Sequence, residues 1–331
     1  MKAAEFDYDL PKTAIAQEPA QPRDSSRLLV VDEPVRHLIT RDLSELVQPG
    51  DVLVVNETRV LPARLNLFKE TGGRAEVLAL EPADEGWWKA LVRPSRRVRP
   101  GTLLREADGG AVLEVGDDLG SGVRLVRSVL GNMLGLLDHL GSVPLPPYIE
   151  TDLDDPQRYQ TVFANQPGSV AAPTAGLHIT DDVLDACQAK GAELAKVELR
   201  VGLGTFRPIE SEDIEGHHMH TELYQIPKAT WERCGEAQRV VAVGTTVVRA
   251  LEAAASSGDL SGETDLFIQP GYDFRVVDAL MTNFHTPRST LLVMVEAFMG
   301  PRWREVYTTA LVEGYRFLSF GDAMFVERMA K

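Results

Sequence analysis

The chain has 331 residues, 44% of them hydrophobic, so it can bury the core of one large domain or two ordinary ones, and its net charge of −15 argues against strong non-specific binding to nucleic acid. Its two cysteines, Cys187 and Cys234, are too few for a disulfide framework and lack zinc-binding spacing. The acidic start from Met1 to Leu10 and the lack of an apolar run of roughly 20 residues argue against a signal peptide and a membrane helix, so we expect a soluble, cytoplasmic protein.

The first clear element is a buried strand over residues 50–56. A Pro49-Gly50 turn precedes its apolar run, which ends at Asn56. From about residue 65 to 149 the residue pattern changes, because short apolar runs are separated by Gly, Pro and Asp. Those runs cover residues 75–80, 87–92, 111–115 and 122–126. This pattern is typical of a small antiparallel β domain, such as a barrel, which a proline cluster at 144–147 closes.

One stretch of this β region is strongly basic. Arg93, Arg96, Arg97 and Arg99 lie within eight residues that include no acid. Such a cluster could contact phosphates, which are bound by Lys and Arg. A solvated loop between two strands explains the same residues, and from the sequence alone it is the favoured interpretation.

After Tyr159 the pattern becomes that of alternating strands and helices. We expect strands over 197–201, 240–243 and 275–281, and helices over 181–190, 247–255 and 291–299. Thr180 and Ser289 are the expected caps, and Gly191 and Gly300 the stops. The fold class is therefore an α/β main domain, with a mixed sheet or barrel and surrounding helices, plus an inserted antiparallel β-barrel. We place the main domain at 1–65 and 151–331 and the insertion at 66–150.

Four loops carry small and polar residues where functional loops of α/β folds lie, at the carboxyl ends of strands. They cover residues 171–178, 199–206, 244–246 and 281–289. Gly244-Thr245-Thr246 would place free backbone N–H groups at a helix start, ready for a carboxylate or phosphate. No loop has the spacing of a dinucleotide-binding or P-loop motif.

The histidines allow two interpretations. Three histidines, His217, His218 and His220, lie close before Glu222, and imidazole and carboxylate groups are both metal ligands. A polar segment at a sheet edge explains the same residues and is the favoured interpretation. His178 and His285 stand singly beside predicted helix starts. Each is either a structural hydrogen-bonding group or an acid–base group.

Taken together, the segments resemble the S-adenosylmethionine:tRNA ribosyltransferase-isomerase family. The resemblance spans nearly the whole chain and is most specific at Gly168-Ser169-Val170-Ala171-Ala172-Pro173-Thr174-Ala175-Gly176-Leu177-His178, at Gly202-Leu203-Gly204-Thr205-Phe206-Arg207-Pro208, and at Met219-His220-Thr221-Glu222. It continues through Val243-Gly244-Thr245-Thr246, Thr282-Asn283-Phe284-His285 and Gly321-Asp322-Ala323-Met324.

This resemblance implies a reaction and its partners. S-adenosylmethionine would be a ribosyl-donating substrate, and the acceptor would be tRNA carrying 7-aminomethyl-7-deazaguanine at the wobble position. The product would be epoxyqueuosine, with adenine and methionine released. A base must remove a C5′ proton, and an acid would help adenine to leave. The resemblance implies no metal and no separate cofactor.

The resemblance also suggests roles for individual residues. His178 and His285 are the acid–base candidates, and Glu222 joins them as a catalytic candidate that could meet a cation. Candidates for substrate binding are Asn56, Arg59, Thr174, Arg200, Gly202, Gly204, Thr205, Gly244, Thr245, Arg249, Asn283 and Asp322; Arg249 would pair with the methionine carboxylate. A turn role explains Asp322 equally well. Arg93, Arg96, Arg97 and Arg99 are the tRNA-binding candidates.

The chain departs from the family pattern at Arg200, where a histidine is usual, at Glu296, where a small residue is common, and at Gly216, where an acid is expected. The departure at Arg200 motivates an alternative, a diverged paralogue that uses S-adenosylmethionine on another acceptor. A second alternative is a tRNA-binding protein without activity, which the acidic balance disfavours.

Overall fold

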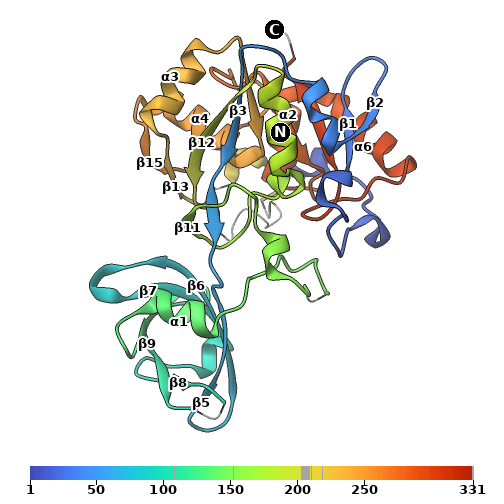
Figure 1. Cartoon of the computed structure of the whole chain (residues 1–331). Helices are drawn as coiled ribbons and strands as arrows, with labels where there is room; N and C mark the ends of the chain where they lie inside the picture. Colours follow the sequence, from blue (N-terminus) through green and yellow to red (C-terminus); the bar gives the residue numbers. More distant parts are fainter. Residues whose placement is uncertain (108, 152, 203–208, 210, 218, 330–331) are drawn as a thin grey trace. The chain divides into compact units, whose positions relative to one another are not determined.

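The computed structural model describes residues 1–107, 109–151, 153–202, 209, 211–217 and 219–329 (Figure 1). The chain forms two compact units. The main unit comprises Met1–Arg59, Pro146–Gln166 and Ala172–Lys331, and the barrel unit comprises Val60–Leu145 and Pro167–Ala171. The barrel unit thus begins before residue 66, ends before residue 150, and includes a returning segment that the sequence pattern assigns to the main domain. That segment is held by a long-range backbone bond, in which Leu61 N donates to Ser169 O at 2.9 Å.

The main unit is built on a nine-stranded mixed sheet, so of the two architectures expected for this domain the structure has the open sheet. The strand order is β15-β13-β12-β3-β14-β16-β17-β1-β2. Strands β12, β3, β14 and β16 are parallel neighbours, so their carboxyl ends meet at one edge. The strands are β1 (Arg27–Val30), β2 (Arg36–Ile39), β3 (Asp51–Asn56), β12 (Glu193–Leu199), β13 (Glu222–Gln225), β14 (Arg239–Val243), β15 (Ser261–Thr264), β16 (Ala279–Asn283) and β17 (Ala323–Glu327).

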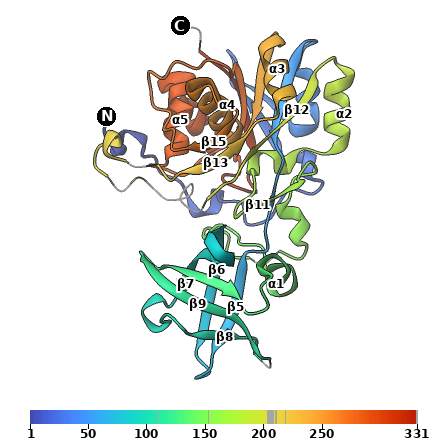
Figure 2. The ribbon, with the colours of Figure 1, turned by 90° about the vertical axis from the view of Figure 1, so that its left-hand side faces the viewer.

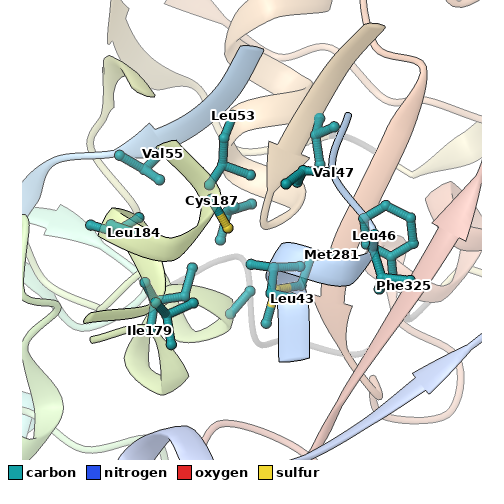
Figure 3. Close-up of a cluster of buried hydrophobic side chains, with 14 of the residues drawn as sticks. Leu43, Leu46, Val47, Leu53, Val55, Ile179, Leu184, Cys187, Met281 and Phe325 are labelled. Atoms are coloured by element: carbon teal, nitrogen blue, oxygen red, sulfur yellow. The ribbon is translucent and has the colours of Figure 1, made fainter. Parts of the chain in front are cut away.

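Helices cover both faces of this sheet. Helix α2 (Asp181–Ala189) covers one face, where Leu53 and Val55 of β3 share a buried apolar cluster with Leu184 and Cys187 of the helix (Figure 3). Helix α4 (Thr245–Ser257) packs on the other face, and Figure 2 shows α2 and α4 on opposite sides of the strands. The remaining helices are α3 (Lys228–Glu236), α5 (Thr290–Met299) and α6 (Trp303–Val312), with short 3-10 turns such as η4 (Thr40–Glu45) and η8 (Thr174–His178).

The caps predicted for two helices are present. The Thr180 side chain accepts a hydrogen bond from Val183 N at the start of α2, and Ser289 does the same for Leu292 N at the start of α5. Two predicted strands have wrong bounds. The strand predicted over 197–201 ends at Leu199. The strand predicted over 275–281 begins only at Ala279, because the backbone N–H groups of residues 275–277 donate to the buried Glu252 carboxylate instead of pairing with a strand.

The barrel unit is a closed six-stranded antiparallel barrel with strand order β10-β7-β6-β5-β8-β9. Its strands are β5 (Arg64–Lys69), β6 (Arg74–Pro82), β7 (Trp88–Arg93), β8 (Leu103–Arg105), β9 (Ala111–Gly120) and β10 (Val123–Ser128), followed by helix α1 (Met133–Leu140). Side chains alternate between the filled interior and solvent, as Trp88, Ala90 and Val92 of β7 do by pointing inward. Two short strands, β4 (Thr58–Val60) and β11 (Gln166–Ser169), pair separately. No helix in the described part of the chain is long and apolar enough to cross a membrane.

Candidate functional site

A pocket lies in the main unit where β14 and β16 end. Its walls come from Ala172–Ala175, from the start of α4 at Gly244–Thr246, and from residues 282–286, with an empty volume of about 640 Å³ that is partly open to solvent. Val201, just beyond β12, also lines it. A crevice at the carboxyl ends of parallel strands is the usual ligand site of such sheets. All four loops predicted to be functional therefore contribute to one pocket, the loop at 199–206 through Val201.

Asn283 connects two of these loops through its amide. Thr174 Oγ1 donates to Asn283 Oδ1 at 2.8 Å, while Asn283 Nδ2 lies 3.1 Å from His178 Nε2 and 3.4 Å from the carbonyl oxygen of Asp322. A carbonyl only accepts, so Nδ2 is the donor in both contacts. His178 Nε2 is therefore unprotonated and its proton lies on Nδ1.

This network gives His178 a different place from the one predicted. His178 is buried, it is not among the residues that line the pocket, and its Nε2 lone pair is already used by Asn283. Burial, with the positive charges of Arg316 and Arg23, lowers the pKa of His178 to about 3. Its position fits a residue that orients Asn283, whereas Asn283 and Thr174 themselves face the pocket.

His285 lines the pocket directly. Its Nε2 lies 3.1 Å from Thr282 Oγ1, its backbone N donates to Tyr307 OH at 3.1 Å, and its carbonyl accepts from Tyr8 OH at 2.5 Å. Burial lowers the pKa of His285 to about 3, so the imidazole is neutral near pH 7. A neutral imidazole has one unprotonated ring nitrogen that can accept a proton, but a pKa this far below 7 makes it a weak base.

Tyr148 and Ser319 are polar residues of the pocket wall that lie outside the four predicted loops. Tyr148 Oη and Ser319 Oγ form a 2.7 Å hydrogen bond, and both side chains face the same pocket. Burial raises the pKa of Tyr148 to about 12. Tyr148 directly follows the proline cluster at 144–147, which the sequence predicts to close the β domain. An aromatic hydroxyl at a predicted domain boundary is the sequence feature that could have identified Tyr148 as a pocket residue.

Glu222 and Arg249 form a buried ion pair with side chains 2% and 3% exposed. Arg249 also donates to the carbonyls of Leu266 and Thr264, and Glu222 Oε1 accepts from Gly202 N at 3.2 Å. The pair joins β13 to α4. Arg249 is thus already neutralised by Glu222, and neither side chain lines the pocket.

Two further candidates are held within the sheet. Asn56 Nδ2 donates to Leu199 O, and Asn56 Oδ1 accepts from Leu199 N and Thr58 N, so the amide holds β3 to β12. Asp322 accepts from the backbone N–H groups of Arg27 and Arg316, at 2.9 and 2.8 Å. Both polar side chains are buried and hydrogen-bonded to the backbone. The position of Asp322 fits the turn role given above as its alternative, and Asn56 connects two strands of the sheet.

The remaining candidates are dispersed. Arg59 and Arg200 are exposed, and Arg200 lies just beyond the end of β12. Gly204, Thr205 and His218 lie outside the described residues. Within the part of the chain that the structure describes, no group of three or more His, Cys, Asp or Glu side chains could hold a metal ion.

The four arginines of the basic cluster lie in the barrel unit, at the end of β7 and around the 3-10 turn Ser95–Arg97. All four are exposed, and Val98 between them is buried. Arg93 Nη1 lies 4.0 Å from Glu76 Oε1, whereas the other three form no ion pair with any described residue. The charges of Arg96, Arg97 and Arg99 are therefore presented to solvent.

A family model described as "Queuosine biosynthesis protein" matches residues 3–326. The chain belongs to this family. It is 53% identical over 330 residues to the S-adenosylmethionine:tRNA ribosyltransferase-isomerase of Rubrobacter xylanophilus, covering 98% of each chain, and 46% identical to that of Natranaerobius thermophilus, covering 99% of this chain and all of the relative. The crystal structure of S-adenosylmethionine tRNA ribosyltransferase from Thermotoga maritima is similar with a TM-score of 0.55 and 38% identity, over 97% of this chain and 99% of that one.

Membership of the queuosine biosynthesis family bears out the resemblance found in the sequence. The match includes both units, because it extends from residue 3 to residue 326. The pocket residues Asn283 and His285 and the arginine cluster thus all lie in the part of the chain that the family covers.

Proposed function

We propose that this enzyme transfers and isomerises the ribosyl part of S-adenosylmethionine onto 7-aminomethyl-7-deazaguanine in tRNA, giving epoxyqueuosine with release of adenine and methionine. The observation that carries the proposal is the 53% identity, over 98% of both chains, with a ribosyltransferase-isomerase. The pocket at the strand ends supports it, because a crevice at the carboxyl ends of parallel strands is the usual ligand site of such sheets. S-adenosylmethionine is thus a substrate in this proposal, with no separate cofactor.

His285 is the candidate for proton transfer. The sulfonium of S-adenosylmethionine acidifies the adjacent C5′ hydrogens, and a neutral imidazole at the pocket wall can accept one of them. Asn283 is held by Thr174 and His178, and both Asn283 and Thr174 line the pocket that would take the nucleoside. The acceptor amine must be neutral when it attacks, which a pocket with few charges favours. Methionine leaves when the epoxide closes.

The arginine cluster supports the tRNA part of the proposal. Three exposed guanidinium groups without a carboxylate partner among the described residues form a local site for phosphates on an otherwise acidic chain.

The test uses S-adenosylmethionine labelled in the ribose, with tRNA that carries or lacks the aminomethyl-deazaguanine. We expect label in the RNA, with adenine and methionine released in equal amounts, only for the modified tRNA. Release of S-adenosylhomocysteine would show methyl transfer and refute the proposal. Label in a small molecule would favour the diverged paralogue that Arg200, in place of the usual family histidine, suggests. Retention of tRNA without turnover would favour a binding protein.

A further inference from the structure

Helix α4 has no side-chain cap at its start, as is also the case for α3 and α6, and of these three helices only α4 begins at the pocket. Helices α1, α2 and α5 begin with Asn132, Thr180 and Ser289, whose side chains accept a backbone N–H of the first turn. Helix α4 begins with Gly244 at φ +93°, which has no side chain to do this. The first N–H groups of a helix have no partner within the helix, and Gly244, Thr245 and Thr246 at the start of α4 line the pocket.

Thr246, in the first turn of α4, provides a second observation. Its side chain lines the pocket and is only 9% exposed, yet its hydroxyl has no hydrogen-bond partner among the described residues. A Cβ placed on Gly244 would lie 3.6 Å from this hydroxyl oxygen. The Thr246 hydroxyl therefore borders the space that a capping side chain would fill. A buried hydroxyl without a partner is unfavourable, which points to a ligand atom at this place.

The charges of the pocket indicate the kind of ligand group. None of the described residues that line it is Lys, Arg, Asp or Glu, and His285 is neutral. Helix N-termini are therefore its source of positive potential, and that of α5 is already capped by Ser289. An anionic group that enters the pocket is best stabilised at α4.

We propose that the start of α4 and the Thr246 hydroxyl bind the α-carboxylate of the methionyl part of S-adenosylmethionine, which takes the place of the missing capping side chain. This inference rests on the proposed function for the identity of the ligand. A carboxylate at the end of a flexible chain can reach a buried helix start. A phosphodiester has a nucleoside on either side and so needs space in two directions, whereas a terminal carboxylate needs it in one.

Calorimetric titration of the full chain tests this with two probes, S-adenosylmethionine and its decarboxylated analogue, which keeps the sulfonium and the amine. Thr246→Val removes the hydroxyl and keeps the shape. We expect it to weaken binding of S-adenosylmethionine about tenfold, the low end for a hydrogen bond to a charged group, and to leave binding of the analogue unchanged. Because no hydrogen bond to a described residue is lost, the Tm of the free variant should equal or exceed that of the wild type.

Thr230→Val is the matched control, because this buried threonine in the first turn of α3 donates to Lys196 O at 2.8 Å and does not line the pocket. It should lower Tm without changing either affinity. If Thr246→Val affects both probes equally or neither, the carboxylate assignment is wrong, and a loss of tRNA affinity alone would assign the site to a phosphate. A wild type that binds neither probe would overturn both this inference and the proposed function. A wild type that binds as expected but transfers no ribosyl group would overturn the proposed function alone.

Discussion

Replacing Glu222 with Gln would leave the buried Arg249 guanidinium without its carboxylate. Removing one partner of a buried ion pair costs about 3–5 kcal/mol, because a charge then stays uncompensated in the interior. The two side chains here are 2% and 3% exposed, so solvent cannot compensate. The carbonyls of Thr264 and Leu266 still accept from Arg249, so we expect the lower value, about 3 kcal/mol.

Equilibrium urea unfolding, followed by circular dichroism, measures this loss. With a denaturant slope of about 2 kcal/mol per molar, the midpoint should fall by about 1.5 M. Glu263→Gln, on the neighbouring strand β15, is the control, because that side chain is exposed and should change stability by no more than about 0.5 kcal/mol. The double variant Glu222→Leu with Arg249→Met should recover much of the loss, since no charge remains buried.

The opposite result would restore the role predicted from the sequence. If Glu222→Gln unfolds at the wild-type urea concentration but loses activity at least about a hundredfold, the carboxylate takes part in the chemistry and the ion pair contributes little to stability.

Four further outcomes are expected. His285→Ala should lower kcat at least about a hundredfold, because His285 faces the pocket, while His178→Ala should act mainly on stability and substrate affinity; the reverse order would identify His178 as the base. Arg96→Ala with Arg97→Ala should reduce the salt dependence of log tRNA affinity by roughly 1 to 2 without changing S-adenosylmethionine affinity, and an unchanged dependence would make the cluster a solvated loop. Arg200→His should keep epoxyqueuosine formation within about tenfold, because Arg200 is exposed; activity that appears only in this variant would place the catalytic group at position 200. The unfolding free energy should fall as pH decreases from 6.5 towards 3, because the unfolded state binds protons on His178 and His285 that the folded state, with both pKa values lowered to about 3, does not. Each histidine contributes about 1.4 kcal/mol per pH unit. A His178→Asn variant whose unfolding free energy depends on pH as steeply as that of the wild type would contradict this.

Local patterns in the sequence predicted the elements that local interactions determine. Thr180 and Ser289 cap their helices through bonds to residues three positions away, so both helix starts are readable from the sequence. The alternating runs likewise predicted the antiparallel barrel. The strand start at Ala279 was not readable, because it depends on the Glu252 carboxylate more than twenty residues earlier in the chain.

The site shows the same limit more strongly. His178 and Asn283 lie 105 residues apart in the sequence but are hydrogen-bonded in the structure. No local sequence pattern shows that the Asn283 amide donates to the lone pair of the His178 imidazole. Similarly, the sequence predicts that Arg249 meets a substrate carboxylate, because it does not show that Glu222 of β13, 27 residues earlier, is its partner. The sequence shows which residue types carry charge, but only the tertiary structure distinguishes a ligand contact from an internal one.

Residues 64 and 142 exchange two backbone hydrogen bonds, from Arg64 N to Ser142 O at 3.0 Å and from Ser142 N to Arg64 O at 2.9 Å. The chain therefore enters and leaves the barrel at neighbouring points. The entropy cost of closing a loop rises with the length of mobile chain between its ends, and a folded barrel removes that length. Once the barrel has formed, only residues 57–63 and 143–192 lie as connecting chain between β3 and β12. The insertion can thus grow, shrink or be exchanged with little effect on how the main sheet assembles.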